Sequence, residues 1–345
     1  MLILSIDTSC DETAAAVTDG RRVLSNVIYS QALLHSQWGG VVPSIAKRAH
    51  EEKIDFVVGK ALKKYKMSDI NAIAVTQGPG LAVALEVGIK KAKELAIKYH
   101  KQLIAVNHME GHIYSNFIQN SKGNPKREFR FPYLALLISG GHTELVLFEG
   151  HLKYKVIGET LDDASGEALD KAGKILGLGY PAGTVIERLA AEVNNVDMYK
   201  FPRPMLRSAN LNFSFSGLKT SFYYYLKNLS EKEIAEKIRF LASSFQEAVF
   251  DTLVYKTEKA MKTTGVKNLI VGGGVIANLY LRKKLRKMIK IYSGSILFPP
   301  YKYLAGDNAA MIGVVGYFKI VNNLAWSEAD IIDRMPKLSL MNKVE

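Results

Sequence analysis

Short apolar runs that end in small polar residues recur along the chain, and they predict strands followed by tight loops. Residues 2–7 form the first run, and residues 14–30 then predict a hairpin with its turn at Asp19-Gly20. Residues 133–139 begin the same pattern again, with the loop GGHT and a second hairpin whose turn is predicted at Glu149-Gly150. One unit of strand, polar loop and hairpin therefore occurs twice.

Each unit is followed by alternating helices and strands. Amphipathic spacing predicts helices at residues 50–67 and 86–100, and residues 309–321 are expected to form an apolar helix. Continuous apolar runs predict buried strands at residues 71–77, 102–108 and 268–274. A duplicated unit of this kind predicts an α/β protein with two mixed sheets flanked by helices and a cleft between the two lobes.

The polar, proline-containing segment 121–130 is the predicted joint between these lobes. We expect an N-terminal lobe of residues 1–129, with a helix of residues 309–325 packing back on it. Residues 130–308 should form the C-terminal lobe, which carries a largely helical insertion around residues 184–264.

Composition narrows the class of protein. The formal net charge of +13 over 345 residues favours a polyanionic partner such as RNA, although a lysine-rich surface would give the same number. Because Cys10 is the single cysteine, disulfide scaffolds and all-cysteine metal sites are excluded. No apolar run has the length of a membrane span, so we expect a cytoplasmic protein with no membrane partner.

The loop SGGHT has mostly small side chains where a strand ends, and anion binding would explain this composition. Glycines let the backbone approach an anion, so amides from both lobes could hold a phosphate; two ordinary glycine turns are the alternative. The matching loop in the first lobe carries Asp7, Asp11 and Glu12. Carboxylates beside a phosphate repel it, so bridging by Mg²⁺ or an acid–base role is expected, with helix and turn capping as the alternative.

Two histidines four residues apart, His108 and His112, would share one face of a helix and reach one metal ion. Asp307 is a candidate third ligand, and such a set suits Fe(II) or Zn(II). Glu110 would lie near the opposite side of the helix, which argues against the peptidase motif H-E-x-x-H. Without further support, two polar helix histidines remain the alternative.

Two further segments suggest ligands but are weak signals. The run GGG before Asn278 leaves space for an adenine beside the backbone, with Asn278 as a hydrogen-bonding partner. Basic residues are dense in the helix that follows, at positions 282, 283, 284, 286, 287 and 290. They fit phosphate contacts along RNA, and a solvated helix explains them equally well.

Taken together, these motifs resemble the tRNA N6-adenosine threonylcarbamoyltransferase family, in the form found in bacteria. The matching segments run in order from residue 6 to residue 312: IDTSCDET, GGVVPSIAKRAH, QGPGL, NHMEGHIYS, LLISGGHTELV, GETLDDASGEALDKAGKILGLGYP, NFSFSGLKT, SFQEAVFDTL, GGGVIANLYLR and GDNAAMI. The chain departs from the family pattern at Ala182, Gly306 and Ala309, where glycine, threonine and glycine are usual.

The resemblance implies the fold shared by actin, Hsp70 and the acetate and sugar kinases (the ASKHA fold). It implies one divalent metal at His108, His112 and Asp307, with Fe²⁺ favoured and Zn²⁺ as the alternative, and activity-linked acidic residues at Asp11 and Glu12. The implied substrate contacts are Leu137, Ile138, Ser139, Gly140, Gly141, Asp170, Gly183, Glu187 and Asn278.

The implied reaction transfers threonylcarbamoyl from threonylcarbamoyl adenylate to N6 of the adenosine 3′ of the anticodon, in tRNAs reading A-starting codons, and releases AMP. The resemblance also implies a paralogous dimerisation partner and a small ATPase. Two alternatives stay open: an ATP-dependent small-molecule kinase or ATPase of the same superfold, and a non-enzymatic tRNA-binding scaffold.

Overall fold

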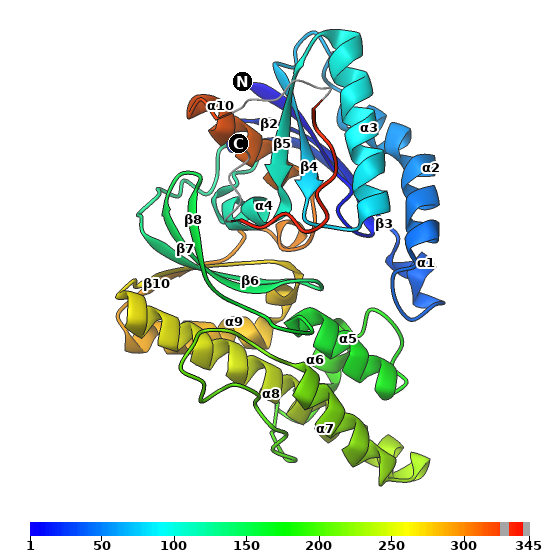
Figure 1. The fold of residues 1–345 in the computed structure, drawn as a ribbon, viewed down its shortest axis with the longest axis vertical. Coiled ribbons are helices and arrows are strands. Elements are labelled where there is room, and N and C mark those ends of the chain that lie inside the picture. Colours follow the sequence, from blue (N-terminus) through cyan, green and yellow to red (C-terminus); the bar gives the residue numbers. More distant parts are fainter. Residues whose placement is uncertain (325–330, 341–345) are drawn as a thin grey trace.

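The computed structural model describes residues 1–324 and 331–340, which form two five-stranded sheets (Figure 1). The first sheet has the order β3-β2-β1-β4-β5, and the second has the order β10-β9-β6-β7-β8. The first sheet contains β1 (Leu2–Asp7), β2 (Glu12–Asp19), β3 (Arg22–Ser30), β4 (Ala72–Gly78) and β5 (Gln102–Asn107). The second contains β6 (Tyr133–Ile138), β7 (Thr143–Gly150), β8 (Lys153–Glu159), β9 (Asn268–Gly272) and β10 (Ser295–Leu297).

The two sheets share one topology, which confirms the predicted duplication. β1 pairs antiparallel with β2 and parallel with β4, and β6 pairs in the same way with β7 and β9. The predicted position of the second hairpin turn, Glu149-Gly150, is wrong. Gly150 still pairs with Lys153, so the turn falls at His151-Leu152. The first turn lies at Gly20-Arg21, one residue later than predicted, since Asp19 pairs with Arg22.

Helices cover the outer faces of both sheets and fill the space between them (Figure 1). The helices are α1 (Ala32–Ser36), α2 (Pro43–Ala61), α3 (Ala82–Tyr99), α4 (His108–Tyr114), α5 (Ser165–Ile175), α6 (Gly183–Glu192), α7 (Ser216–Lys227), α8 (Glu231–Thr264), α9 (Leu279–Ile291) and α10 (Ala309–Val321). Short 3-10 turns are η1 (Ser115–Phe117), η2 (Gly274–Ala277) and η3 (Lys302–Leu304).

Several helix boundaries differ from the expectation, among them the end of α2 at Ala61 rather than at residue 67 and the start of α3 at Ala82 rather than at residue 86. α2 begins at Pro43 rather than at residue 50, because proline is compatible with the first helical position and Ala46 and Ala49 extend the buried face. α10 ends at Val321, before the expected end at residue 325, which lies outside the described residues. Asn323 has a φ of 55°, a left-handed conformation that is common just after a helix ends.

Side chains that alternate along the strands divide the interior into three cores. α2 and α3 pack on one face of the first sheet, while α4 and α10 lie between the two sheets. Leu134 and Leu136 of β6 face the helices α5 to α9, whereas Ala135 and Leu137 face the core between the sheets. The Ser5 hydroxyl donates to the Ala309 carbonyl at 2.6 Å, which joins β1 to α10.

The parallel strands decide where the site forms. β1, β4 and β5 end at Asp7, Gly78 and Asn107, and β6 and β9 end at Ile138 and Gly272. In open α/β sheets ligands bind at the carboxyl ends of strands, and the motifs DTSC, QGPG, NHMEGH, SGGHT and GGGV all follow such ends. In the described part of the chain, the helices are too short or too polar to cross a membrane.

Candidate active site between the two lobes

A cavity of about 740 Å³ lies where these loops from the two sheets meet. Eight residues singled out from the sequence line it: Asp11, Glu12, His108, Ser139, Gly140, Gly141, Asp170 and Asp307. Neighbouring lining residues that the sequence did not indicate include Gly39, Lys171, Lys174, Tyr180 and Pro336. The cavity therefore combines an acidic wall from the first lobe with glycine-rich backbone and lysines from the second.

His108, His112 and Asp307 come together in the structure although 195 positions separate the last two (307 − 112). Asp307 Oδ1 lies 3.4 Å from His108 Nε2 and 3.3 Å from His112 Nε2. The two histidines occupy successive turns of α4, which begins here because the Asn107 side chain accepts a hydrogen bond from the Met109 amide at 2.8 Å. Both imidazoles are buried, with His112 fully so.

The chemistry of these residues fits a divalent metal. His112 is buried with neither ring nitrogen hydrogen-bonded to a described residue, an arrangement that is costly without a ligand. Donor atoms about 2.0–2.2 Å from one ion lie roughly 3.0–3.5 Å apart, which matches the two histidine–aspartate distances. Two histidines and one carboxylate form a set typical of non-haem iron, and zinc accepts the same ligands.

The pKa of His112 and the charges around His108 also fit a bound cation. Burial lowers the pKa of His112, so its imidazole is neutral near pH 7, as a metal ligand must be. Burial also opposes protonation of His108, but the carboxylates of Asp307 and Asp7 outweigh it and raise the pKa of His108 to about 10. The buried carboxylate of Asp7 and the partly exposed one of Asp307 thus favour a positive charge beside them.

Glu110 faces away from this cluster. Its carboxylate lies 3.2 Å from Lys319 Nζ on α10, inside the core between the sheets. The helical-face argument against a peptidase therefore agrees with the structure, since a water-activating glutamate would have to reach the metal.

The SGGHT loop forms a tight turn with an open surface. Ser139 N donates to the His142 carbonyl at 2.9 Å, and His142 N donates to Ser139 Oγ at 3.1 Å. A Cβ added at Gly140 or Gly141 would meet no atom within 4 Å, and neither amide is hydrogen-bonded to a described residue. Both amides are available to an anion in the cavity.

The acidic wall contains one carboxyl group suited to proton transfer. Burial, with Asp11 and Asp307 nearby, raises the pKa of Glu12 well above its ordinary value, while Ser30 Oγ donates to Glu12 Oε1 at 3.1 Å. On the opposite wall, burial raises the pKa of Asp170, although the amides of Ala182 and Gly183 oppose that shift. The Ala182 amide donates to Asp170 Oδ1 at 2.8 Å.

Five of the predicted substrate contacts do not line the cavity. The side chains of Leu137 and Ile138 are fully buried in two different cores, and Gly183 is the first residue of α6. Glu187 Oε1 accepts from the Leu279 amide at 2.8 Å, and Asn278 Oδ1 accepts from the Leu281 amide at 3.0 Å. Both side chains thus stabilise the start of α9, and their contact with substrate stays a prediction.

The departures from the family pattern leave the cluster intact. Ala182 is fully buried, and its Cβ lies 2.0 Å from the position that a Cβ on Gly173 would take. The Gly306 carbonyl accepts from Asn308 Nδ2 at 2.9 Å, and Gly306 lines the cavity. Ala309 is fully buried at the start of α10.

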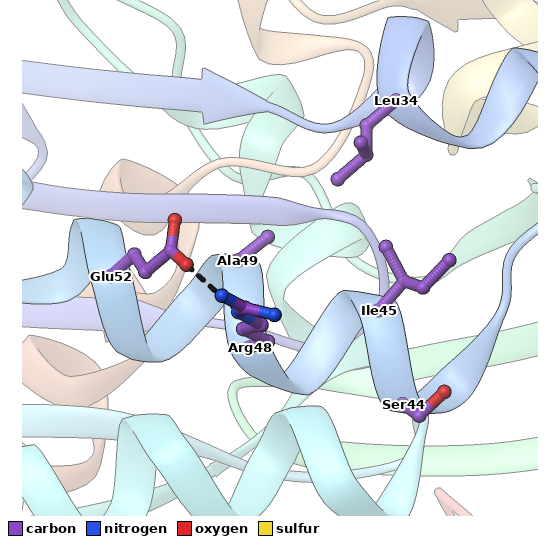
Figure 2. Close-up of a pocket in the computed structure, with 6 residues that line it drawn as sticks. All are labelled: Leu34, Ser44, Ile45, Arg48, Ala49 and Glu52. Carbon is purple, nitrogen blue, oxygen red and sulfur yellow. Dashed lines mark hydrogen bonds and ion pairs between the residues drawn. The ribbon is translucent and has the colours of Figure 1, made fainter.

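A second hollow of about 500 Å³ lies on the outside of the first lobe, beside α1 and α2. Figure 2 shows Leu34 on one side and Ile45 and Ala49 on the other, next to the ion pair between Arg48 and Glu52. Near it in the sequence, the side chains of Leu33 and Trp38 are 87% and 60% exposed, so large apolar side chains face solvent in this part of the chain.

Solved structures of known proteins share this fold. HypF from T. kodakarensis matches 93% of this chain and 48% of its own, with a TM-score of 0.62 and 14% identity. The activator of 2-hydroxyisocaproyl-CoA dehydratase from Clostridium difficile, with bound ADPNP, matches 95% of this chain and 99% of its own, with a TM-score of 0.53 and 13% identity. These matches confirm the ASKHA fold class.

Sequence comparisons give the family. The family model described as "TsaD: tRNA N6-adenosine threonylcarbamoyltransferase" matches residues 22–314. A protein of that name from Geotalea uraniireducens is 47% identical over 327 residues, covering 94% of this chain and 93% of the relative. Another from Caldicellulosiruptor saccharolyticus is 44% identical and covers 100% of both chains. The chain therefore belongs to the tRNA N6-adenosine threonylcarbamoyltransferase family and is a transferase.

Proposed function

We propose that the protein transfers threonylcarbamoyl from threonylcarbamoyl adenylate to N6 of the adenosine 3′ of the anticodon, in tRNAs reading A-starting codons, and that AMP is released. The observation that carries this proposal is the shared cavity. A two-histidine, one-aspartate cluster and an open glycine loop face the same space from opposite lobes. An adenylate needs an anion site for its phosphate, and its carbonyl needs polarisation.

Each side chain has a role in this reaction. His108, His112 and Asp307 would hold a divalent metal, with Fe²⁺ favoured over Zn²⁺, and this metal would supply Lewis-acid polarisation of a carbonyl. The amides of Gly140 and Gly141 hold the phosphate or a developing oxyanion; in other enzymes one such donor contributes about 3–4 kcal/mol. Glu12, whose raised pKa favours the protonated form, and Asp11 handle protons near the leaving group, or hold Mg²⁺ with the nucleotide.

In this proposal Asp170 forms the adenylate side of the cavity, and Gly183 acts through its backbone hydrogen bond to the Asp170 carboxylate. Ser139 shapes the anion loop, while Leu137 and Ile138 contribute only through the strand that carries it. Glu187 and Asn278 support the start of α9 beside that wall. Their effect on substrate would then be through the position of η2, whose Gly274 lines the cavity.

The basic helix α9 is the proposed contact for tRNA, in the cytoplasm. Leu281, Leu285, Met288 and Ile289 are its buried apolar residues, and Lys284 is held by Glu247 at 2.5 Å and Asp251 at 2.7 Å. Lys283, Lys287 and Lys290 are exposed and, among the described residues, form no ion pair, so they are the proposed phosphate contacts. Because each such contact releases counterions, binding should weaken steeply with salt.

The hollow beside α1, with the exposed apolar side chains near it in the sequence, is the proposed docking surface for the paralogous dimerisation partner. A partner would cover Leu33, Leu34 and Trp38, whose exposure to water is otherwise unfavourable. We expect Leu34→Glu to abolish co-elution with that partner in gel filtration. Ile97→Glu on α3 is the matched control, since Ile97 is 60% exposed but lies outside the hollow.

A reconstituted reaction tests the activity. The purified protein, its partner, the small ATPase, threonylcarbamoyl adenylate and unmodified tRNA are mixed, and AMP and the modified nucleoside are measured. We expect both products with the wild type, and neither with His112→Ala. His100→Ala is the control, because His100 is exposed and follows α3. ATP turnover with a small metabolite and no tRNA modification would favour the kinase alternative, and tRNA binding without either reaction would favour the scaffold.

A further inference from the structure

Asp7 lies directly behind the proposed metal cluster and takes no part in it as a ligand. It is the last residue of β1 and is fully buried. Its Oδ1 accepts a hydrogen bond from Thr76 Oγ1 at 2.7 Å and lies 3.6 Å from His108 Nδ1. Its Oδ2 is buried and, among the described residues, has no hydrogen-bond partner. A buried carboxylate with so few partners is costly unless it serves another group.

The sheet fixes this carboxylate in place. Asp7 pairs with Ala14 of β2 on one side, and its neighbour Ile6 pairs with Val75 of β4 on the other. Thr76 therefore lies beside Asp7, and β5 next to β4 leads directly into His108. The adjacent strands β1, β4 and β5 thus bring together the Asp7 carboxylate, the Thr76 hydroxyl and the imidazole of His108, which directly follows β5.

His108 lies between two carboxylates. Its Nδ1 lies 3.6 Å from Asp7 Oδ1, an ion-pair separation just beyond hydrogen-bond distance, and its Nε2 lies 3.4 Å from Asp307 Oδ1. A histidine that binds metal through one ring nitrogen commonly directs the other N–H to a carboxylate, which fixes the tautomer and the ring orientation. Because the Asp7 carboxylate lies on the Nδ1 side of the ring, Nε2 is the nitrogen directed toward His112 and Asp307.

Direct contact between Asp7 and the substrate does not fit the structure. The cavity is lined by the later residues Ser9, Cys10, Asp11 and Glu12. Asp7 does not line it and has no exposed surface. Its position suits an effect that passes through His108.

We propose that Asp7 is a positioning residue, which holds the His108 imidazole with Nε2 toward the cluster and increases the affinity of the site for a divalent cation. This inference rests on the proposed metal site. The role needs no substrate and no turnover, so it can be measured on the protein and the metal alone.

The experiment titrates metal-free protein with Co²⁺ and follows the visible absorption of the bound ion, with competition by a chelator to obtain the affinity. We expect Asp7→Asn to weaken binding about 10- to 100-fold, the usual effect of removing such a partner. Asp7→Glu restores the carboxylate and should recover part of the affinity. Ser5→Ala is the matched control, since Ser5 is also buried in β1 and bonds to Ala309 rather than to the cluster; its affinity should stay within about twofold.

Wild-type affinity and an unchanged Co²⁺ spectrum in folded Asp7→Asn would overturn the proposal. If that variant does not fold, Thr76→Val decides the question, because it removes the hydrogen bond to Asp7 Oδ1 and keeps the charge. We expect a shifted Co²⁺ spectrum and about threefold weaker binding, and an unchanged titration would overturn the role. A wild-type protein that binds Co²⁺ but does not modify tRNA would refute the proposed function and leave this inference standing.

Discussion

Glu144 offers a sharp test of how burial controls stability in the second lobe. It lies on β7, pairs with Leu137 on one side and Glu159 on the other, and its Oε2 is buried without a hydrogen-bond partner among the described residues. Burial, with a smaller contribution from the Glu159 charge, raises the pKa of Glu144 from 4.5 to about 7. Replacement by glutamine removes the charge and keeps the shape.

The sign and size of the effect follow from proton linkage. Because the folded state binds the proton more tightly, stability is fully present below about pH 4.5 and is lost as the pH rises through about 7. The interval between the two pKa values corresponds to about 3 kcal/mol, at about 1.4 kcal/mol for each pH unit. Part of the side chain still contacts water, so we expect Glu144→Gln to be more stable than wild type by about 1–3 kcal/mol at pH 8.

The assay is urea unfolding followed by circular dichroism, at pH 5 and pH 8. The gain at pH 8 should shrink to below about 1 kcal/mol at pH 5, where Glu144 is protonated in the folded protein and ionised in only part of the unfolded chains. Glu149→Gln is the matched control, since Glu149 lies on the same strand and is exposed. An equal change at both pH values, or a loss of stability at pH 8, would refute the reasoning.

Three further changes test other contacts. Gly78→Ala would bring a Cβ within 1.8 Å of the Met335 carbonyl, so we expect residues 331–340 to lose hydrogen-exchange protection; unchanged protection would contradict the contact. Lys256→Met removes a buried ammonium that donates to Ser208 and to the Asn210 carbonyl, and thermal unfolding should show a loss of about 1–3 kcal/mol, whereas an unchanged midpoint would argue against these bonds. Phe245→Ala leaves a cavity at a fully buried site and should lower the free energy of unfolding in urea by about 3–5 kcal/mol. A loss below about 1 kcal/mol would mean that neighbouring side chains fill the cavity.

The sequence alone determined the elements and their repetition. Apolar runs that end in glycine or aspartate are local signals, so the strands, the hairpins and the duplicated topology could be predicted from them. The spacing of His108 and His112 is equally local, because four residues make about one helical turn. The positions of hairpin turns and helix ends are harder to predict, because one further pair of backbone hydrogen bonds moves a turn without changing the apolar pattern.

Only the tertiary structure decided which side chains meet. Asp307 reaches His112 because the segment between β10 and α10 crosses back between the lobes, and no local pattern encodes that distance. In the same way, Asn278 and Glu187 have the residue types of ligands, yet the folded chain uses them to start α9. Asp7 lies beside the cluster because β1 ends there, and Pro336 lines the cavity because its carbonyl accepts a hydrogen bond from the Gly80 amide. Periodicity follows from the geometry of one element, whereas a site depends on how several elements pack, and packing is a property of the whole chain.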